Sequence, residues 1–253
     1  MVLCIDTGNT RVKIAMVDGS GVHRLADVDT KRVVENPEIV SRLLQNAQRR
    51  AGDPRGAALS SVVPGANAAL RKAVRSVFDI STLVIDGRSR SPIRPNVKNR
   101  QAVGADRLAA AAGLHPRTAN AVIVDIGSAV TVDLVEGRVF KGGLIMAGPA
   151  LSLRALGTFA RRLPVIDHSG IARHFPAGFN DTRPSMVLGA HIGVLGAVKE
   201  AVRFLSNTSR AKPRVIVTGG GAAVFAERWP AGWRSDPDLV FRGIHRIWLL
   251  NRS

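Results

Sequence analysis

Short apolar segments alternate along the chain with longer segments in which apolar residues recur at helical spacing. Strands are expected at residues 2–6, 11–17, 57–63, 82–86, 121–125, 129–135, 138–145 and 214–218. Helices are expected at residues 35–51, 66–78, 104–113, 151–161 and 183–205, and residues 238–251 form a final helix or strand. Strands that alternate with helices predict an α/β fold. His115-Pro116 marks a boundary, so we expect an N-terminal lobe at residues 1–117 and a C-terminal lobe at residues 118–253.

Each half opens with a β-hairpin whose tip carries the same residue types. Asp6 and Gly8 follow an apolar strand in the first half, and Asp125 and Gly127 do so at one common offset in the second. Glycine allows a tight turn and a close approach of the backbone to a ligand, and successive N–H groups in such a turn can bind an anion. Two ordinary hairpins, in which Asp and Gly only form turns, are the alternative. The repetition favours two lobes that face a nucleotide, and hence an ATP-dependent enzyme.

The side chains near these tips fit phosphate chemistry. Thr10 and Ser128 supply hydroxyl groups, and Lys13 supplies a positive charge. Asp6 and Asp125 cannot bind phosphate directly, because like charges repel. A carboxylate at this position makes sense if it holds a cation, or a cation-bound water, beside the phosphates.

A second candidate segment, Gly104-Ala105-Asp106-Arg107, begins an alanine-rich helix. Arg107 can pair with a substrate carboxylate through its fork of donors. Asp106 can accept the proton of a nucleophilic alcohol during phosphoryl transfer. The alternative is a helix start with an acidic residue in its first turn, which the helix dipole favours, next to a surface arginine.

Glycines also follow the strand expected at residues 214–218. Residues 218–221 read Thr-Gly-Gly-Gly, and such a backbone can lie flat beneath a ring such as adenine. Strand-to-helix turns often contain glycine as well, so this adenosine segment is a weak signal by itself.

The helix expected at residues 183–205 has a polar start and a glycine face. Asp181 or Thr182 is expected to cap its N-terminus. Gly189, Gly193 and Gly196 lie on one face at helical spacing. That face predicts close helix packing or contact with a second subunit.

Composition limits the classes of protein further. The formal net charge is +17, which can indicate nucleic-acid binding. However, the charges are scattered, and no zinc-ligand set, helix-turn-helix signal or aromatic RNA-binding platform accompanies them, so nucleic-acid binding is not expected. No run of about 18 apolar residues predicts a membrane span. The one cysteine, Cys4, allows no internal disulfide and fits a cytoplasmic protein.

Seven motifs, taken in order, resemble the type III pantothenate kinase family. They are Asp6-Thr7-Gly8-Asn9-Thr10-x-x-Lys13, Gly104-Ala105-Asp106-Arg107, Asp125-Ile126-Gly127-Ser128-Ala129-x-Thr131-x-Asp133, Gly142-Gly143, Leu151-Ser152-Leu153-Arg154-Ala155-Leu156, Asn180-x-Thr182 and Thr218-Gly219-Gly220. The resemblance covers nearly the whole chain. The family belongs to the superfamily of acetate and sugar kinases, chaperone ATPases and actin. The resemblance implies two ribonuclease-H-like lobes with a nucleotide cleft between them. It also implies a homodimer, with a substrate pocket that draws on both subunits, and ATP-dependent phosphorylation of pantothenate in coenzyme A synthesis.

The resemblance further implies roles for single residues. Asp106 would be the catalytic base, Asp125 would ligate a monovalent cation (potassium or ammonium), and Ser128 would contact ATP, the co-substrate, which magnesium would accompany. The ATP phosphate loop would comprise Asp6, Thr7, Gly8, Asn9, Thr10, Arg11, Val12 and Lys13. The residues that bind pantothenate would be Gly104, Ala105, Asp106, Arg107 and Thr182.

Three departures from the family pattern leave alternatives open. Ser128 stands where the family usually has Thr, Val97-Lys98-Asn99-Arg100 replaces a Tyr-x-Asn-Pro element, and a proline of the segment after Gly142-Gly143 moves to Pro149. A kinase for another small hydroxy-acid is one alternative, which only the missing tyrosine favours. A non-catalytic accessory or regulatory relative is the other. The retention of Asp106 argues against it, because a binding protein needs no base.

Overall fold

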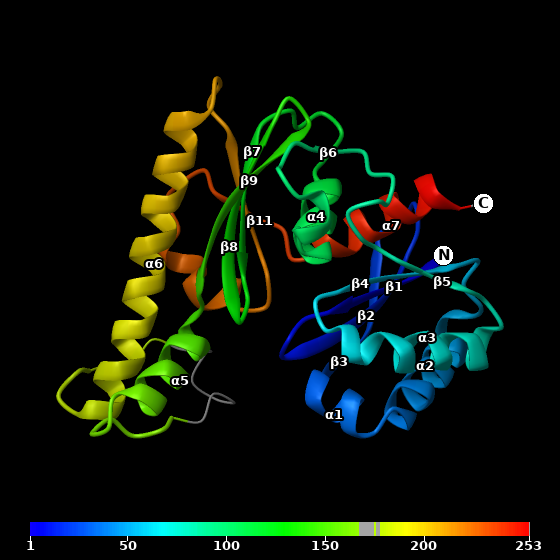
Figure 1. The fold of residues 1–253 in the computed structure, drawn as a ribbon, viewed down its shortest axis with the longest axis horizontal. Coiled ribbons are helices and arrows are strands. Elements are labelled where there is room, and N and C mark those ends of the chain that lie inside the picture. Colours follow the sequence, from blue (N-terminus) through cyan, green and yellow to red (C-terminus); the bar gives the residue numbers. More distant parts are fainter. Residues whose placement is uncertain (167–174, 176–177, 253) are drawn as a thin grey trace. The chain divides into compact units, whose positions relative to one another are not determined.

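Residues 1–166, 175 and 178–252 are described by the structure, a computed structural model (Figure 1). Its contacts divide the chain into unit 1, residues 1–117, 138–140 and 238–253, and unit 2, residues 118–137 and 141–237. The expected division into lobes at residue 117 stays a prediction. The contact grouping differs from it because residues 138–140 and the C-terminal helix pack with the first part of the chain.

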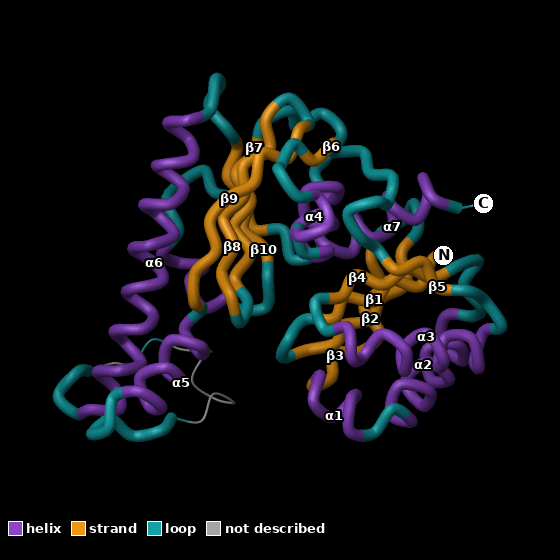
Figure 2. Tube along the Cα trace, in the orientation of Figure 1, coloured by secondary structure: helices purple, strands orange, loops and turns teal. Residues whose placement is uncertain are grey.

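Unit 1 has three layers. Its sheet has the strand order β3-β2-β1-β4-β5, in which β1 runs antiparallel to β2 and parallel to β4. The strands are β1 Val2–Thr7, β2 Arg11–Val17, β3 Val22–Asp29, β4 Ala57–Ser61 and β5 Thr82–Val84. The helices are α1 Thr30–Glu35, α2 Glu38–Ala51, α3 Pro64–Phe78, α4 Ala105–Gly113 and α7 Leu239–Asn251. Buried residues of α1, α2 and α3 pack with those of β1, β2 and β4 in one core, and α7 contacts the same strands (Figure 2).

Helices α4 and α7 of unit 1 touch through their backbones. A Cβ atom at Gly243 would overlap the carbonyl of Ala109, and one at Gly113 would overlap the carbonyl of Leu239. Glycine at both contacts allows the two helix axes to approach closely. This packing fixes the position of α4, on which the candidate residues Asp106 and Arg107 lie.

Unit 2 is built on a mixed sheet covered by a long helix. The strand order is β11-β10-β7-β8-β9-β6, with β7 antiparallel to β8 and parallel to β10. The strands are β6 Arg94–Pro95, β7 Ala121–Ile126, β8 Ala129–Glu136, β9 Val139–Ala147, β10 Arg214–Thr218 and β11 Arg234–Ser235. β6 pairs with the first residues of β9, at 139–140, and these two segments are grouped with unit 1. The helices of unit 2 are α5 Pro149–Phe159 and α6 Thr182–Thr208, with the short 3-10 helix η3 Ala222–Arg228, whereas the 3-10 helix η1 Arg100–Ala102 belongs to unit 1.

One side of α6 packs on this sheet and another side is exposed. Val194, Val198 and Val202 of α6 join the apolar residues of β7 and β8 in one core.

Among the described helices, α6 alone is long and apolar enough to cross a membrane by length and composition, with an 18-residue window of mean hydropathy 1.3. Of that window 44% is buried inside the structure, and the core helix of a soluble protein meets the same test.

Most predicted elements are confirmed, and the main differences lie in the first half. The helix predicted at residues 35–51 begins only at Glu38, as α2, and the short helix α1, Thr30–Glu35, was not predicted, with a break at residues 36–37 between the two. Proline lacks an N–H group and disfavours helical geometry in the preceding residue, so the break falls there. β3 was not predicted, because this strand at one edge of the sheet is half-exposed, and its polar and apolar residues lack the regular alternation that marks a half-buried strand. The final segment is the helix α7.

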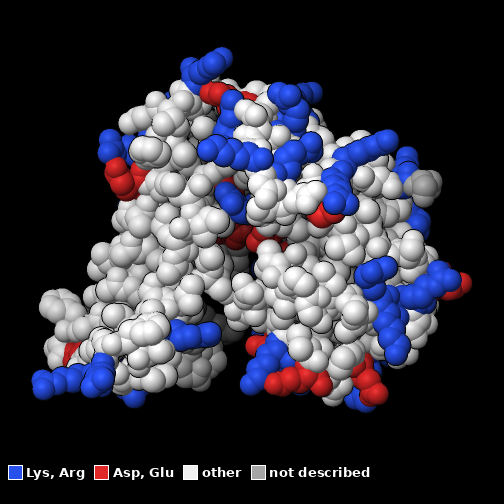
Figure 3. Space-filling view, viewed as in Figure 1, with Lys and Arg blue, Asp and Glu red and all other residues white. Residues whose placement is uncertain are grey.

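Charge on the visible face follows the scattered pattern of the sequence. Figure 3 shows lysine and arginine atoms over both units in mostly separate groups, with uncharged surface between them. Several arginines pair with a nearby acid, as Arg11 does with Asp27 and Arg203 with Glu200. On this face the net charge of +17 is not gathered into one block.

Candidate active site

The hairpin tip between β1 and β2 is a tight turn held from two sides. The N–H of Gly8 donates to the carbonyl of Arg11 over 2.9 Å and closes the turn. Thr30, at the start of α1, donates from its hydroxyl to the carbonyl of Gly8 over 2.7 Å, and its N–H donates to the carbonyl of Thr10 over 3.0 Å. Thr30 is buried, so the tip is anchored to α1.

The residues of this tip differ in what they offer to a ligand. Val12 is fully buried in the core, so only its backbone is available. Arg11 turns away to Asp27 of β3, with 2.6 Å between Nε and Oδ1. Thr7 is buried, and its hydroxyl has no hydrogen-bond partner among the described residues. Lys13 of β2 is the register partner of Asp6 on β1.

Two carboxyl groups of unit 1 have a raised pKa, and the charge of one contributes to the shift of the other. Burial raises the pKa of the Asp6 carboxyl to about 6, although the ammonium group of Lys13 lowers it, and the charge of Asp106 adds to the rise. Burial also raises the pKa of Asp106, against the N–H and the charge of Arg107. The structure therefore brings the phosphate-loop Asp6 and the candidate base Asp106 into electrostatic contact. A carboxyl whose pKa is shifted towards neutral pH is a better general base.

The N-terminus of α4 presents Asp106 and Arg107 together. Gly104 is the N-cap residue, and a Cβ atom there would lie 2.5 Å from Oδ1 of Asp106. The N–H of Arg107 donates to the same Oδ1 over 2.8 Å. The guanidinium carbon of Arg107 is 5.5 Å from the centroid of the Phe140 ring. Ala105 is buried, so its side chain faces the interior.

The second hairpin tip, between β7 and β8 of unit 2, is one residue shorter than the first. The first tip contains residues 8–10 and the second residues 127–128. The shorter turn changes the register, so Asp125 pairs with Thr131 and not with a counterpart of Lys13. A hydroxyl group thus lies opposite Asp125, where a lysine lies opposite Asp6.

Two glycines fit closely around this second tip. A Cβ atom at Gly148, the N-cap of α5, would overlap the carbonyl of Gly127, and the N–H of Gly148 donates to the carbonyl of Ser128 over 2.9 Å. Gly219 has φ +95° and follows β10, and a Cβ atom there would overlap Oδ1 of Asp125. The backbone of the glycine triplet therefore lies directly against the Asp125 carboxylate.

Thr182 belongs to a different part of unit 2. It is the first residue of α6, and its N–H donates to the side chain of Asp181, the N-cap. Thr182 is exposed in a shallow depression, whose other lining residues are Leu163, Phe179, Asn180, Asp181, Ser185 and Met186. None of these residues belongs to the second hairpin tip.

Asp6→Asn is expected to raise the free energy of unfolding at pH 7.5 by about 1–3 kcal/mol, since one unit of pKa shift corresponds to about 1.4 kcal/mol. The folded pKa of about 6 lies above the ordinary value of 3.8, so folding favours the protonated carboxyl. The ionised carboxylate of Asp6 therefore lowers the free energy of unfolding. This destabilisation is fully present above about pH 6 and is absent below about pH 4. Urea unfolding of both proteins should show a gain that shrinks to about a third at pH 4.5. An equal gain at both pH values would contradict the raised pKa. Glu38→Gln, at an exposed carboxylate, is the control.

The sequence did not indicate several residues that shape this site. Thr30 holds the first tip through its hydroxyl, yet the sequence pattern predicted no helix start and no site residue at this position. The approach of Phe140 to Arg107 joins positions far apart in the chain. The sequence showed that no lysine accompanies Asp125, since Val132 stands at the offset of Lys13, but it did not show that the second tip is shorter.

Known proteins resemble the chain over nearly its whole length. Residues 2–203 match the type III pantothenate kinase family. The type III pantothenate kinase of Acidiphilium cryptum (strain JF-5) is 34% identical over 257 residues, which cover 99% of this chain and 95% of that protein. The type III pantothenate kinase of Dehalococcoides mccartyi (strain ATCC BAA-2266 / KCTC 15142 / 195) is 31% identical over 258 residues, which cover 99% of this chain and 98% of that protein.

Two solved structures share the fold. A conserved putative Baf family transcriptional activator from Campylobacter jejuni has a TM-score of 0.59 at 19% identity and covers 98% of both chains. The ethanolamine utilization protein EutJ from Carboxydothermus hydrogenoformans has a TM-score of 0.55 at 18% identity and covers 98% of this chain and 89% of that chain. These similarities concern the fold alone and confirm the predicted α/β architecture. The family match and the identity to its members show that this chain belongs to the type III pantothenate kinase family.

Proposed function

We propose that this chain transfers the γ-phosphate of ATP to the hydroxyl group of pantothenate, which gives 4'-phosphopantothenate and ADP in the first step of coenzyme A synthesis. The observation that carries the proposal is the pair Asp6 and Asp106, two carboxyl groups with raised pKa in one unit. Asp6 lies on β1 opposite Lys13, just before the glycine turn, and Asp106 lies beside Arg107 at the start of α4. Membership of the family supports the choice of substrate.

ATP binds at the two hairpin tips in this proposal. Residues 6–13 form the phosphate loop, in which Lys13 supplies the positive charge, Thr7 has a buried hydroxyl, and Val12 can contribute only its backbone. Ser128 contacts ATP from the second tip. The anchor from Thr30 to Gly8 keeps the first turn in place before ATP binds. Such preorganised donors lower the cost of ordering on binding.

Asp106 acts as the general base, within a pantothenate segment formed by Gly104, Ala105, Asp106 and Arg107. The attacking hydroxyl gives its proton to a carboxylate oxygen of Asp106, its oxygen forms the bond to the γ-phosphorus, and ADP leaves. Arg107 pairs with the carboxylate of pantothenate, because a guanidinium binds a carboxylate through two parallel hydrogen bonds.

A monovalent cation, potassium or ammonium, is held in part by Asp125. The donors present suit such an ion, since the carboxylate of Asp125 has the hydroxyl-bearing Thr131 as its register partner and lies against the backbone of Gly219. The cation would screen the carboxylate from the phosphates of ATP.

An assay of ADP release tests this function directly. ADP formation should require pantothenate, should follow pantothenate concentration to saturation, and should be faster with potassium chloride than with sodium chloride. ADP release that is independent of pantothenate would contradict the proposal. Faster turnover of another small hydroxy-acid would favour the alternative that the missing tyrosine left open.

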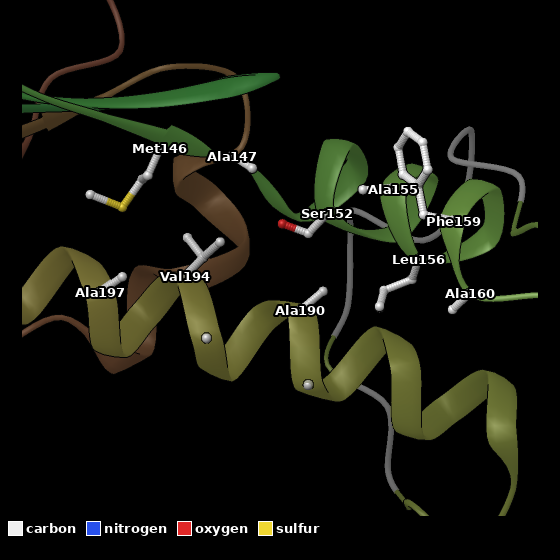
Figure 4. A pocket seen from close by; sticks show the side chains of 12 residues that line it. Met146, Ala147, Ser152, Ala155, Leu156, Phe159, Ala160, Ala190, Val194 and Ala197 are labelled. Atoms are coloured by element: carbon white, nitrogen blue, oxygen red, sulfur yellow. The ribbon is translucent and has the colours of Figure 1, made fainter. Parts of the chain in front are cut away.

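The proposed enzyme is a homodimer that uses the exposed side of α6. The groove between α5 and α6 is lined by small and apolar residues (Figure 4). Added Cβ atoms at Gly189, Gly193 and Gly196 would meet no atom within 4 Å, so this glycine face does not serve packing within the described chain. Large apolar side chains are exposed in the same unit: Leu144, Ile145, Leu151, Leu156, Phe159, Val165, Phe179, Ile192 and Phe204. A second copy that covers this surface would explain both features.

Gly193→Leu is expected to weaken or abolish the dimer without a loss of folding, because the new side chain has free space within its own chain. Sedimentation of the wild type at micromolar concentration should give about twice the chain mass, and the variant should approach the monomer mass with unchanged circular dichroism. Ala223→Leu, at an exposed position of η3, serves as the control for added apolar surface. A Gly193→Leu protein that stays dimeric and active would show that this face is not a close contact.

A further inference from the structure

The ring of Phe140 lies against the guanidinium group of Arg107 within unit 1. The distance of 5.5 Å from the Arg107 Cζ atom to the ring centroid is within the range at which a cation is attracted to an aromatic face. Phe140 is only 1% exposed and is among the largest fully buried side chains. The ring is thus shielded from water on the side that packs into the unit, which strengthens such an attraction.

The backbone around Phe140 also holds the segment that leads into α4. Pro95 of β6 is the register partner of Phe140, and the N–H of Asn96 donates to the carbonyl of Phe140 over 2.9 Å. From there the chain runs through η1 into Gly104 and α4, and Asn99 caps η1 with its side chain. Phe140 therefore acts on Arg107 in two ways. Its carbonyl group holds the segment that leads into α4, and its ring contacts the guanidinium group of Arg107.

Arginine needs such support if it is to recognise a carboxylate. Its long side chain has about 2 kcal/mol of rotamer entropy, and the planar fork must be oriented before both hydrogen bonds can form. Contact with a ring face restricts the guanidinium plane before a ligand arrives, and preorganisation of this kind improves affinity. The base of the Arg107 side chain is already fixed, because α4 packs on α7 through Gly113 and Gly243.

We propose that Phe140 is a positioning residue, which orients Arg107 towards the carboxylate of the substrate and so favours an acid over an uncharged analogue. The inference rests on the function proposed above. Phe140 acts through Arg107 and does not touch the substrate. The effect of the Phe140 side chain can be tested separately from that of its backbone, because the hydrogen bond from Asn96 uses only the backbone carbonyl group.

Phe140→Met is the variant that tests this inference. Methionine fills a similar volume and stays apolar but has no ring face. The two substrates are pantothenate and pantothenol, which keeps the accepting hydroxyl and carries an alcohol in place of the carboxylate. We expect KM for pantothenate to rise about threefold to thirtyfold. KM for pantothenol and KM for ATP should stay within a factor of two of the wild type, roughly the scatter expected without a change in binding.

A ring-retaining variant and a distant control complete the experiment. Phe140→Tyr should restore most of the affinity for pantothenate, whereas Phe78→Met, on α3, should change neither KM. Equal increases of KM for the acid and the alcohol would overturn the inference, because the ring would then only support the fold. An unchanged KM for pantothenate in Phe140→Met would overturn it too, with the proposed function intact. A wild type that phosphorylates neither compound would contradict the proposed function and this inference together.

Discussion

Asp106→Asn is expected to lower kcat by about 10²–10⁴-fold, the usual contribution of a positioned general base. The amide keeps the shape of the side chain but cannot accept the proton of the attacking hydroxyl. Binding of ATP should change little, since the proposed phosphate loop lies on the β1–β2 hairpin, outside α4, and keeps its anchor to Thr30. Single-turnover kinetics with saturating pantothenate measure the chemical step, and calorimetric titration measures the affinity for ATP.

The same substitution at a second aspartate separates the fall in kcat from the mere loss of one negative charge. Asp79, at the C-terminus of α3, has a left-handed backbone that asparagine also tolerates, and its side chain is 88% exposed. Asp79→Asn should leave kcat unaltered. A turnover of Asp106→Asn within a few-fold of the wild type would remove Asp106 from the role of base. If the wild type were equally slow, the result would favour the alternative that this chain is a non-catalytic relative of the family.

Activity is expected to fall at least tenfold when potassium and ammonium are replaced by sodium, and Asp125→Asn should remove this dependence together with most of the activity. Loss of a metal ligand or of its supporting contacts typically costs about 10- to 100-fold in metal affinity or activity. A carboxylate that faces phosphates is costly unless a cation lies between them. Initial rates after rigorous removal of potassium and ammonium, followed by titration with each chloride salt, measure the effect.

Gly219→Ala provides a second test of the same site. The Cβ atom would overlap Oδ1 of Asp125, and the φ of +95° is strained for alanine, so the potassium needed for half-maximal activity should increase. Gly65→Ala, in α3 and with no atom within 4 Å of the added carbon, is the control. Full activity of the wild type in sodium alone would contradict the proposed cation site.

The pattern of apolar positions predicted the strands that carry the candidate site. The hairpins β1–β2 and β7–β8 and the helix α4 each combine a segment rich in apolar residues with a glycine next to it, so local sequence was sufficient. The edge strand β3 lacks such a period because its residues are half-exposed. The predicted helix start at residue 35 was three residues too early, because Pro37 breaks the helical geometry between α1 and α2.

Contacts between distant parts of the chain could not be predicted from the local pattern of apolar residues. The raised pKa of Asp6 depends on burial and on Asp106, which the sequence separates by many residues. The pairing of Asp125 with Thr131 follows from a turn that is one residue shorter, a detail that alignment of the two hairpins by Asp and Gly hides. Phe140 approaches Arg107 because residues 138–140 pack with unit 1.

Direct transfer of phosphate is the measurement closest to the central claim. Purified protein is incubated with pantothenate and with ATP labelled in its γ-phosphate, in potassium buffer, and the products are separated and identified by mass. The account predicts that label enters pantothenate as a phosphate ester on its hydroxyl group, with one ADP formed for each ester. It also predicts that Asp106→Asn forms this ester at least 100-fold more slowly, in line with the loss of a general base. Label that appears only as inorganic phosphate, or on no acceptor at all, would contradict the claim that this chain is a pantothenate kinase.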